Sequence, residues 1–157
     1  MRVGYGYDAH RLIDGRPLVL GGVVIPFEKG LLGHSDADVL IHAICDALLG
    51  AVALGDIGHH FPDNRAEYKN IDSTILLKKV TELLSDKGFS IGNIDATLRL
   101  QQPKIAPYIG QMRERVSAAT GISIDCISIK ATTTEEMGFE GTGEGISAST
   151  VVLIIEK

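Results

Sequence analysis

The amino-acid sequence predicts an α+β sandwich, in which a mixed β-sheet carries helices on one face and packs against other subunits through its second face. Segments in which apolar side chains alternate with period two occur over residues 3–7 and 90–101 and predict strands. Between them, one long segment is apolar on nearly every side, as in a buried helix. The predicted helices are too few to cover both faces of a sheet, so we expect a partner subunit on the open face.

Composition and charge narrow the class of protein. The chain has 157 residues, of which 45% are hydrophobic and 22% charged, and we expect a single folded domain over residues 1–157. Its 15 Lys and Arg against 20 Asp and Glu give a net charge of −5, which argues against a nucleic-acid-binding protein. No apolar run reaches the roughly 18 residues of a membrane span, and the N-terminus does not resemble a targeting segment. These features predict a cytoplasmic protein without a membrane partner.

The N-terminal segment predicts a β-meander. Residues 3–7 alternate apolar side chains with glycine, as in a strand. Residues 18–20 and 23–27 are apolar and flank Gly21-Gly22, which is typical of a two-residue hairpin turn.

A buried helix is expected from residue 38 to about residue 53, where apolar side chains recur at four-residue steps. Asp38, His42 and Asp46 are its exceptions, and their spacing of i, i+4 and i+8 places them in one polar stripe. A polar stripe on an otherwise apolar helix is costly unless its members have partners.

The second half of the chain predicts two helices and three strands. Asp72 and Ser73 can cap a helix that ends near residue 87, before Gly88. The remaining elements are a strand over residues 90–101, a helix over 108–120, and strands over 126–131 and 149–155.

Three side chains are candidates for a metal site. Asp8 and His10 are two residues apart on or just after a strand, so they point to the same side. His42 is the best third ligand, because Asp, His and His suit Zn²⁺ and leave one coordination position open. On spacing alone, a hydrogen-bonded core histidine is the more common explanation of His42. His59 and His60 are left out, because adjacent residues on a strand point to opposite faces.

Three loops are candidates for binding a phosphate, a sugar hydroxyl or a diphosphate. Residues 34–36 precede the buried helix, where backbone N–H groups favour anions such as phosphate, although from the sequence alone a plain helix cap is the favoured explanation. Asp56 could accept from a sugar diol or serve as an ordinary turn residue. Residues 130–135, Lys-Ala-Thr-Thr-Thr-Glu, could hold a diphosphate with a hard cation through hydroxyls and Glu135.

Taken together, these segments resemble the family of 2-C-methyl-D-erythritol 2,4-cyclodiphosphate synthases over the whole chain. The resemblance rests on seven motifs that occur in the family's order: Gly-Tyr-Asp8-Ala-His10, Gly33-His34-Ser35-Asp36-Ala-Asp38-Val, His42, Gly55-Asp56-Ile-Gly58, Phe61-Pro62-Asp63, Gln-Pro103-Lys104 and Lys130-Ala-Thr-Thr-Thr-Glu135.

The resemblance implies a phosphorus–oxygen lyase of the non-mevalonate isoprenoid pathway. Members of the family convert 4-diphosphocytidyl-2-C-methyl-D-erythritol 2-phosphate into the 2,4-cyclodiphosphate and CMP by intramolecular phosphoryl transfer. They act as homotrimers with active sites between subunits, each site holding one Zn²⁺ and one Mg²⁺ or Mn²⁺. The whole chain, residues 1–157, would be one cyclodiphosphate synthase domain.

Residue roles follow from the resemblance position by position. Asp8, His10 and His42 would bind Zn²⁺, and Glu135 would bind the second cation. His34 and Thr133 would stabilise the transition state. The substrate would contact Asp8, His10, His34, Ser35, Asp56, Ile57, Gly58, Phe61, Pro62, Asp63, Asn64, Arg65, Leu100, Gln101, Gln102, Pro103, Lys104, Ile105, Ala106, Ala131, Thr132, Thr133, Thr134, Glu135 and Phe139.

Two further expectations concern single positions. Asp46 is expected to hydrogen-bond His42 and fix its tautomer, the alternative being a bond elsewhere. Thr142 stands where many family members carry Arg, so a phosphate contact near the trimer axis lacks its usual residue here.

Two rival functions follow from the same residues. One is a non-catalytic trimeric protein that binds zinc structurally or senses an isoprenoid diphosphate, which three ligands rather than four disfavour. The other is a zinc phosphodiesterase that uses water, with Asp38 or Asp46 as the general base. Hydrolysis would give a linear product and the synthase reaction a cyclic one.

Overall fold

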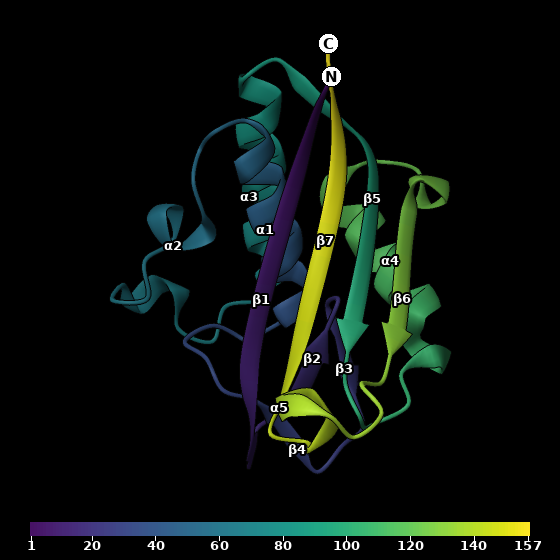
Figure 1. Cartoon of the computed structure of the whole chain (residues 1–157). Helices are drawn as coiled ribbons and strands as arrows, with labels where there is room; N and C mark the ends of the chain where they lie inside the picture. The colour runs from purple at the N-terminus through teal and green to yellow at the C-terminus, as the bar shows by residue number, and fades with distance from the viewer.

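A five-stranded mixed β-sheet forms one layer of the molecule (Figure 1), and the computed structural model describes residues 1–157. The strand order is β4-β1-β7-β5-β6, in which β1 spans Arg2–Asp14, β4 Lys29–Leu31, β5 Phe89–Arg99, β6 Ile127–Thr132 and β7 Gly145–Glu156. β5 and β6 run parallel, whereas the other neighbouring pairs are antiparallel. The mixed sheet expected from the sequence is confirmed.

Three helices cover one face of this sheet (Figure 1), namely α1 (Val39–Ala51), α3 (Ser73–Asp86) and α4 (Ile109–Thr120). Each lies within a few residues of its predicted bounds. α1 is the most deeply buried of the three, with nearly all of its apolar side chains in the core, as its sequence indicated. Asp38 caps α1, since its side chain accepts a hydrogen bond from the N–H of Ile41.

Two glycines set the approach of α1 to β1. A Cβ atom at Gly4 would collide with the carbonyl oxygen of Ala47, and one at Gly6 with that of Ala43. The alternation in residues 3–7 therefore marks a strand, as predicted, with its glycines turned inward against α1. The tyrosines of β1 face away from the helices.

The expected N-terminal β-meander is wrong. β2 (Leu18–Leu20) and β3 (Val23–Ile25) form the predicted hairpin, but they make a separate two-stranded sheet. β1 instead pairs with β7 along the ten residues from Arg2 to Arg11. The hairpin docks on α1, because Asp38 also accepts from the N–H groups of Gly21 and Gly22 at 2.9 and 2.7 Å.

Several short elements were not predicted. They are α2 (Ile57–His60), α5 (Gly138–Gly141), β4, and the 3₁₀ turns η1 (Ala66–Tyr68), η2 (Ala106–Tyr108) and η3 (Ile124–Cys126). Segments of three or four residues are too short to show a hydrophobic period. β7 also begins at Gly145, four residues before its predicted start, because Gly145 pairs with Arg11.

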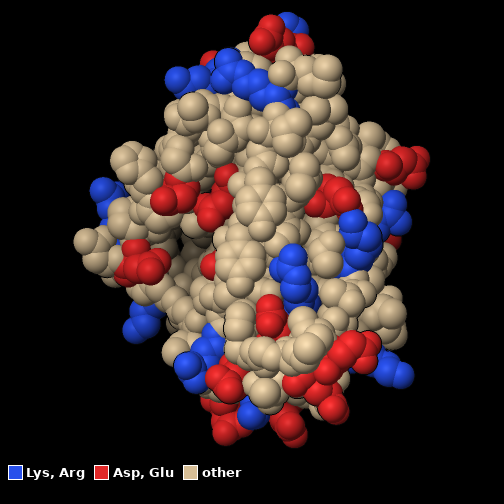
Figure 2. Space-filling view, in the orientation of Figure 1, with Lys and Arg blue, Asp and Glu red and all other residues tan.

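The second face of the sheet is open, and few charged side chains lie along its middle (Figure 2). Val3, Tyr5 and Tyr7 of β1 and Val151 and Ile155 of β7 are all exposed there. A partner subunit on this face stays a prediction. None of the helices combines the length and apolar character that crossing a membrane requires.

Candidate metal centre

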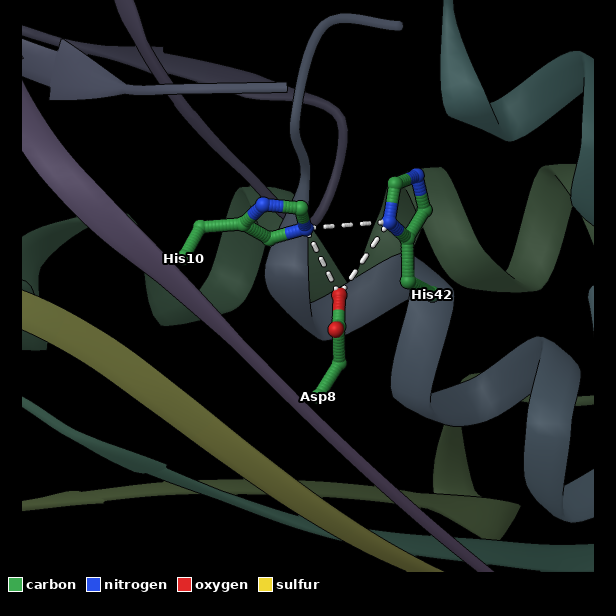
Figure 3. A group of neighbouring side chains, drawn as sticks. All are labelled: Asp8, His10 and His42. Atoms are coloured by element: carbon green, nitrogen blue, oxygen red, sulfur yellow. Dashed lines mark hydrogen bonds and ion pairs between the residues drawn. The ribbon is translucent and has the colours of Figure 1, made fainter. Parts of the chain in front are cut away.

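Asp8, His10 and His42 converge on one point, as predicted. Asp8 and His10 extend from β1 and His42 from α1, and the three side chains point toward one another (Figure 3). Asp8 Oδ2 lies 2.8 Å from His10 Nε2 and 3.1 Å from His42 Nδ1, and the two nitrogens are 3.3 Å apart. One carboxylate oxygen and two imidazole nitrogens within 4.8 Å of one another form a donor set that fits a divalent metal ion.

The charges of the cluster suit a metal ligand set. Burial raises the pKa of Asp8, but hydrogen bonds and charge interactions with His10 and His42 outweigh it, and the pKa falls to about 2. Burial lowers the pKa of His10, but the hydrogen bond and the charge of Asp8 outweigh it, and the pKa rises. Asp8 is therefore an anion at neutral pH and can bind a cation directly.

The far nitrogen of each imidazole is also engaged. His10 Nδ1 lies 2.8 Å from the carbonyl oxygen of Leu32, so Nδ1 carries the proton and Nε2 faces the cluster. His42 Nε2 lies 3.0 Å from Ser73 Oγ and 3.1 Å from Ser35 Oγ, which leaves Nδ1 facing the cluster. Hydrogen bonds of this kind orient metal-binding histidines.

A pocket of about 210 Å³ opens over the cluster. Its lining brings together nine residues that are predicted from the sequence to bind metal or substrate: Asp8, His10, His34, Ser35, His42, Ile57, Gly58, Phe61 and Asp63. Gly33, Tyr68 and Leu76 complete the lining. Tyr68 and Leu76 were missed, because the first lies in a turn and the second belongs to the apolar face of α3, where core packing was the natural explanation.

The loop before α1 is held in place from several sides. Arg16 donates to the carbonyl oxygens of Gly33 and Ser35 at 2.7 and 2.8 Å. His34 Nε2 lies 2.9 Å from the carbonyl oxygen of Arg65, so that nitrogen is the donor. His34 and Ser35 of this loop line the pocket.

Asp46 does not contact His42, so the expectation that it fixes this imidazole is wrong. Its Oδ1 accepts from the N–H of Ile57 at 2.7 Å, at the start of α2. Asp56 caps α2 by accepting from the N–H of His59, and His60 Nε2 donates to the carbonyl oxygen of Leu54. Neither His59 nor His60 lines the pocket, in agreement with their omission from the site.

A second group of candidate residues lies apart from this pocket. None of residues 100–106 and 131–135 lines it. β5 and β6 are parallel, so the segments that follow them meet at one edge of the sheet, where the N–H of Leu100 donates to Thr132 O at 3.1 Å. Thr133 and Glu135 are exposed there. Phe139 lines a different pocket, together with His10 and Gly145.

Asp38 and Asp46, the two carboxylates considered as general bases, accept hydrogen bonds from backbone N–H groups. Asp38 is fully buried and accepts three backbone N–H groups, from Gly21, Gly22 and Ile41. Burial raises its pKa. Neither Asp38 nor Asp46 lines the pocket, which argues against a hydrolytic reaction that uses either of them as a base.

Comparisons with known proteins agree with this geometry. The YgbB family model matches residues 1–155. The 2-C-methyl-D-erythritol 2,4-cyclodiphosphate synthase of Trichlorobacter lovleyi is 60% identical over 157 residues, covering 100% of both chains. A solved CDP-bound 2C-methyl-D-erythritol-2,4-cyclodiphosphate synthase is 36% identical with a TM-score of 0.90, covering 98% of this chain and 100% of that one. The IspF of Plasmodium falciparum in complex with CDP is 35% identical with a TM-score of 0.87, covering 99% and 96%.

Proposed function

The chain belongs to the YgbB family and has 2-C-methyl-D-erythritol 2,4-cyclodiphosphate synthase activity, and from this premise we propose how its residues carry out the reaction. The enzyme is a lyase of the non-mevalonate pathway that converts 4-diphosphocytidyl-2-C-methyl-D-erythritol 2-phosphate into the 2,4-cyclodiphosphate and CMP. The observation that carries the proposal is the convergence of Asp8, His10 and His42 in a pocket that also contains His34 and Ser35.

Asp8, His10 and His42 would hold Zn²⁺. Three ligands leave a position open, and the mixture of one oxygen and two nitrogen donors suits this ion. Zinc bound there supplies Lewis acidity toward a phosphoryl oxygen of the substrate. Glu135 would hold Mg²⁺ or Mn²⁺, since an exposed carboxylate is a ligand that hard cations prefer.

The remaining residues would hold the substrate in a reactive conformation and stabilise its negative charge. The 2-phosphate of the substrate attacks the β-phosphorus and CMP leaves, so the protein positions the reacting groups and supplies no nucleophile. Ser35 and His34 line the pocket and would contact the reacting phosphates. Asp63 and the loop through Asn64 and Arg65 would flank the methylerythritol part. Thr133 would add a hydroxyl to the transition state.

We also propose that the active site is completed by a neighbouring subunit in a homotrimer. Within one chain, residues 100–106 and 131–135 lie outside the pocket of the metal cluster. The open sheet face carries exposed Val3, Tyr5, Tyr7 and Val151, which association would bury. Residues 100–106 and 131–133 of one subunit would then bind the cytidine over the neighbour's pocket. CDP-bound relatives support a cytidine site in this family.

The test is ³¹P NMR of the purified protein with substrate, Zn²⁺ and Mg²⁺, with and without chelator. We expect a cyclic diphosphate and CMP, and no product when the metals are chelated. A linear phosphate product would indicate the phosphodiesterase, and bound but unchanged substrate would indicate the binding protein. One domain over residues 1–157, a cytoplasmic location and the absence of nucleic-acid partners stay predictions of the sequence.

A further inference from the structure

The side of His42 that faces away from Asp8 and His10 carries a second, ordered set of polar groups. His42 Nε2 lies 3.0 Å from Ser73 Oγ, and Ser73 is the first residue of α3 and has no exposed surface. Ser73 in turn contacts Asp36, whose Oδ1 is 2.5 Å from Ser73 Oγ and whose Oδ2 is 3.0 Å from Ser73 N. Three residues from three segments of the chain thus form one connected row.

The direction of each hydrogen bond follows from the groups involved. The carboxylate of Asp36 can only accept, so the hydroxyl proton of Ser73 points to Asp36. The oxygen of Ser73 is then free to accept, and the N–H at Nε2 of His42 is the donor within reach. With its proton on Nε2, a neutral His42 has its lone pair on Nδ1, the nitrogen that faces Asp8 and His10.

We propose that Ser73 and Asp36 are positioning residues for the metal site, which fix His42 in the tautomer that binds metal and transmit the negative charge of Asp36 to its ring. The inference rests on the proposed metal site at Asp8, His10 and His42. A carboxylate acting through an N–H of a ligating histidine raises the basicity of the ligand and holds the ring in place. Here the carboxylate acts through one intervening hydroxyl.

Ser35 is the other group near Nε2, and its place is different. Its oxygen lies 3.1 Å from Nε2 and accepts from the N–H of Ala37, but it contacts no carboxylate. Ser35 also lines the pocket, where the substrate phosphates would bind, whereas Ser73 and Asp36 do not line it. Substitutions of Ser73 and Asp36 therefore change the support of His42 without removing a group that lines the pocket.

The experiment measures the zinc dissociation constant of the metal-free protein by competition with a chromogenic chelator. We expect S73A to bind zinc about 10- to 100-fold more weakly than the unsubstituted chain, which is the usual effect of removing such a partner. D36N should weaken binding in the same direction, because the amide lacks the charge. S73T keeps a hydroxyl at the same position and should retain most of the zinc affinity.

D72N is the matched control. Asp72 caps the same helix by accepting from Thr74 N and Thr74 Oγ1, and it contacts neither Asp36 nor His42. D72N should loosen the start of α3 and leave the zinc affinity unchanged. The thermal midpoint of each metal-free variant separates loss of folding from loss of binding, and D36N serves as the test if S73A does not fold.

The possible results distinguish the role of Ser73 and Asp36 from the existence of the metal site. Full zinc affinity in folded S73A and D36N would overturn the role of Ser73 and Asp36. An equal loss in D72N would assign the effect to the helix start and would also overturn it. If the unsubstituted chain binds no zinc, or if H42A binds it as tightly, the proposed metal site itself fails.

Discussion

The backbone N–H of Ile57 donates a 2.7 Å hydrogen bond to Asp46 Oδ1, one turn beyond His42 on the same helix. Ile57 begins α2, and Ile57 and Gly58 line the pocket over the metal cluster. One helix therefore carries a proposed metal ligand and anchors a wall of the pocket. The carboxylate of Asp46 thus ties this wall to the helix of His42, together with the hydrogen bond between His60 Nε2 and Leu54 O.

Replacing Asp46 tests this anchor. D46A leaves the N–H of Ile57 without its partner, at a cost of about 1 kcal/mol, and we expect KM for the substrate to rise roughly fivefold with the zinc content unchanged. D46N keeps an oxygen that can accept this hydrogen bond, so its KM should be closer to that of the unsubstituted enzyme. Steady-state kinetics and metal analysis check both, and loss of zinc in D46A would place Asp46 in the metal site after all.

Replacing His42 tests the metal cluster. H42A removes one of three donors, so we expect loss of bound zinc and of cyclic product while the fold is kept. H60A is the control, because the ring of His60 contacts the carbonyl oxygen of Leu54 and does not line the pocket. Metal analysis and ³¹P NMR give the result, and a normal zinc content in H42A would remove this histidine from the site.

Acid should weaken the contribution of Asp8 to stability. Its pKa is lowered from 3.8 to about 2 in the folded protein, so it stabilises the fold above about pH 4, and this contribution is lost as the pH falls toward 2. We expect the free energy of unfolding of the metal-free protein to exceed that of D8N at pH 5, with the difference shrinking between pH 4 and 2. Urea unfolding at several pH values measures it, and a difference that grows in acid would contradict the assignment.

Adding a methyl group at Gly6 should destabilise the core. In G6A the new Cβ would collide with Ala43 O, so α1 must move away from β1, at a cost of about 1–3 kcal/mol of unfolding free energy. G110A is the control, because a Cβ at Gly110 meets nothing within 4 Å and alanine favours the helix α4 by about 0.5–1 kcal/mol. Urea unfolding should move the two variants in opposite directions.

A charge on the open sheet face should break the proposed homotrimer. Val151 pairs with Tyr5 at the centre of this face and is 47% exposed in one chain. V151E would place a carboxylate in the contact, so we expect monomers and little cyclic product. V24E is the control, because Val24 lies on the separate β2–β3 hairpin and is 65% exposed. Sedimentation velocity measures the oligomeric state of each variant. An active monomer of the unsubstituted chain would contradict the proposed trimer.

Much of the fold could be predicted from local patterns. The helix from residue 38 onward was identified because apolar side chains on nearly all sides require burial, and α1 occupies that place. Short elements such as α2 and β4 could not be predicted, because three or four residues show no period. The pairing of β1 with β7 was also out of reach, since it joins residues at opposite ends of the chain.

The sequence by itself determined that Asp8 and His10 lie on the same side of a strand, because side chains in a strand alternate with period two. Only the tertiary structure decided that His42 joins them, because that depends on how closely α1 packs against the inward glycines of β1. The same packing brings the carboxylate of Asp46 to the N–H of Ile57. It also places Ser73 and Asp36 on the side of His42 that faces away from the cluster. Local spacing sets which way a side chain points, whereas its partners come from distant segments that only the packed chain brings within hydrogen-bond distance.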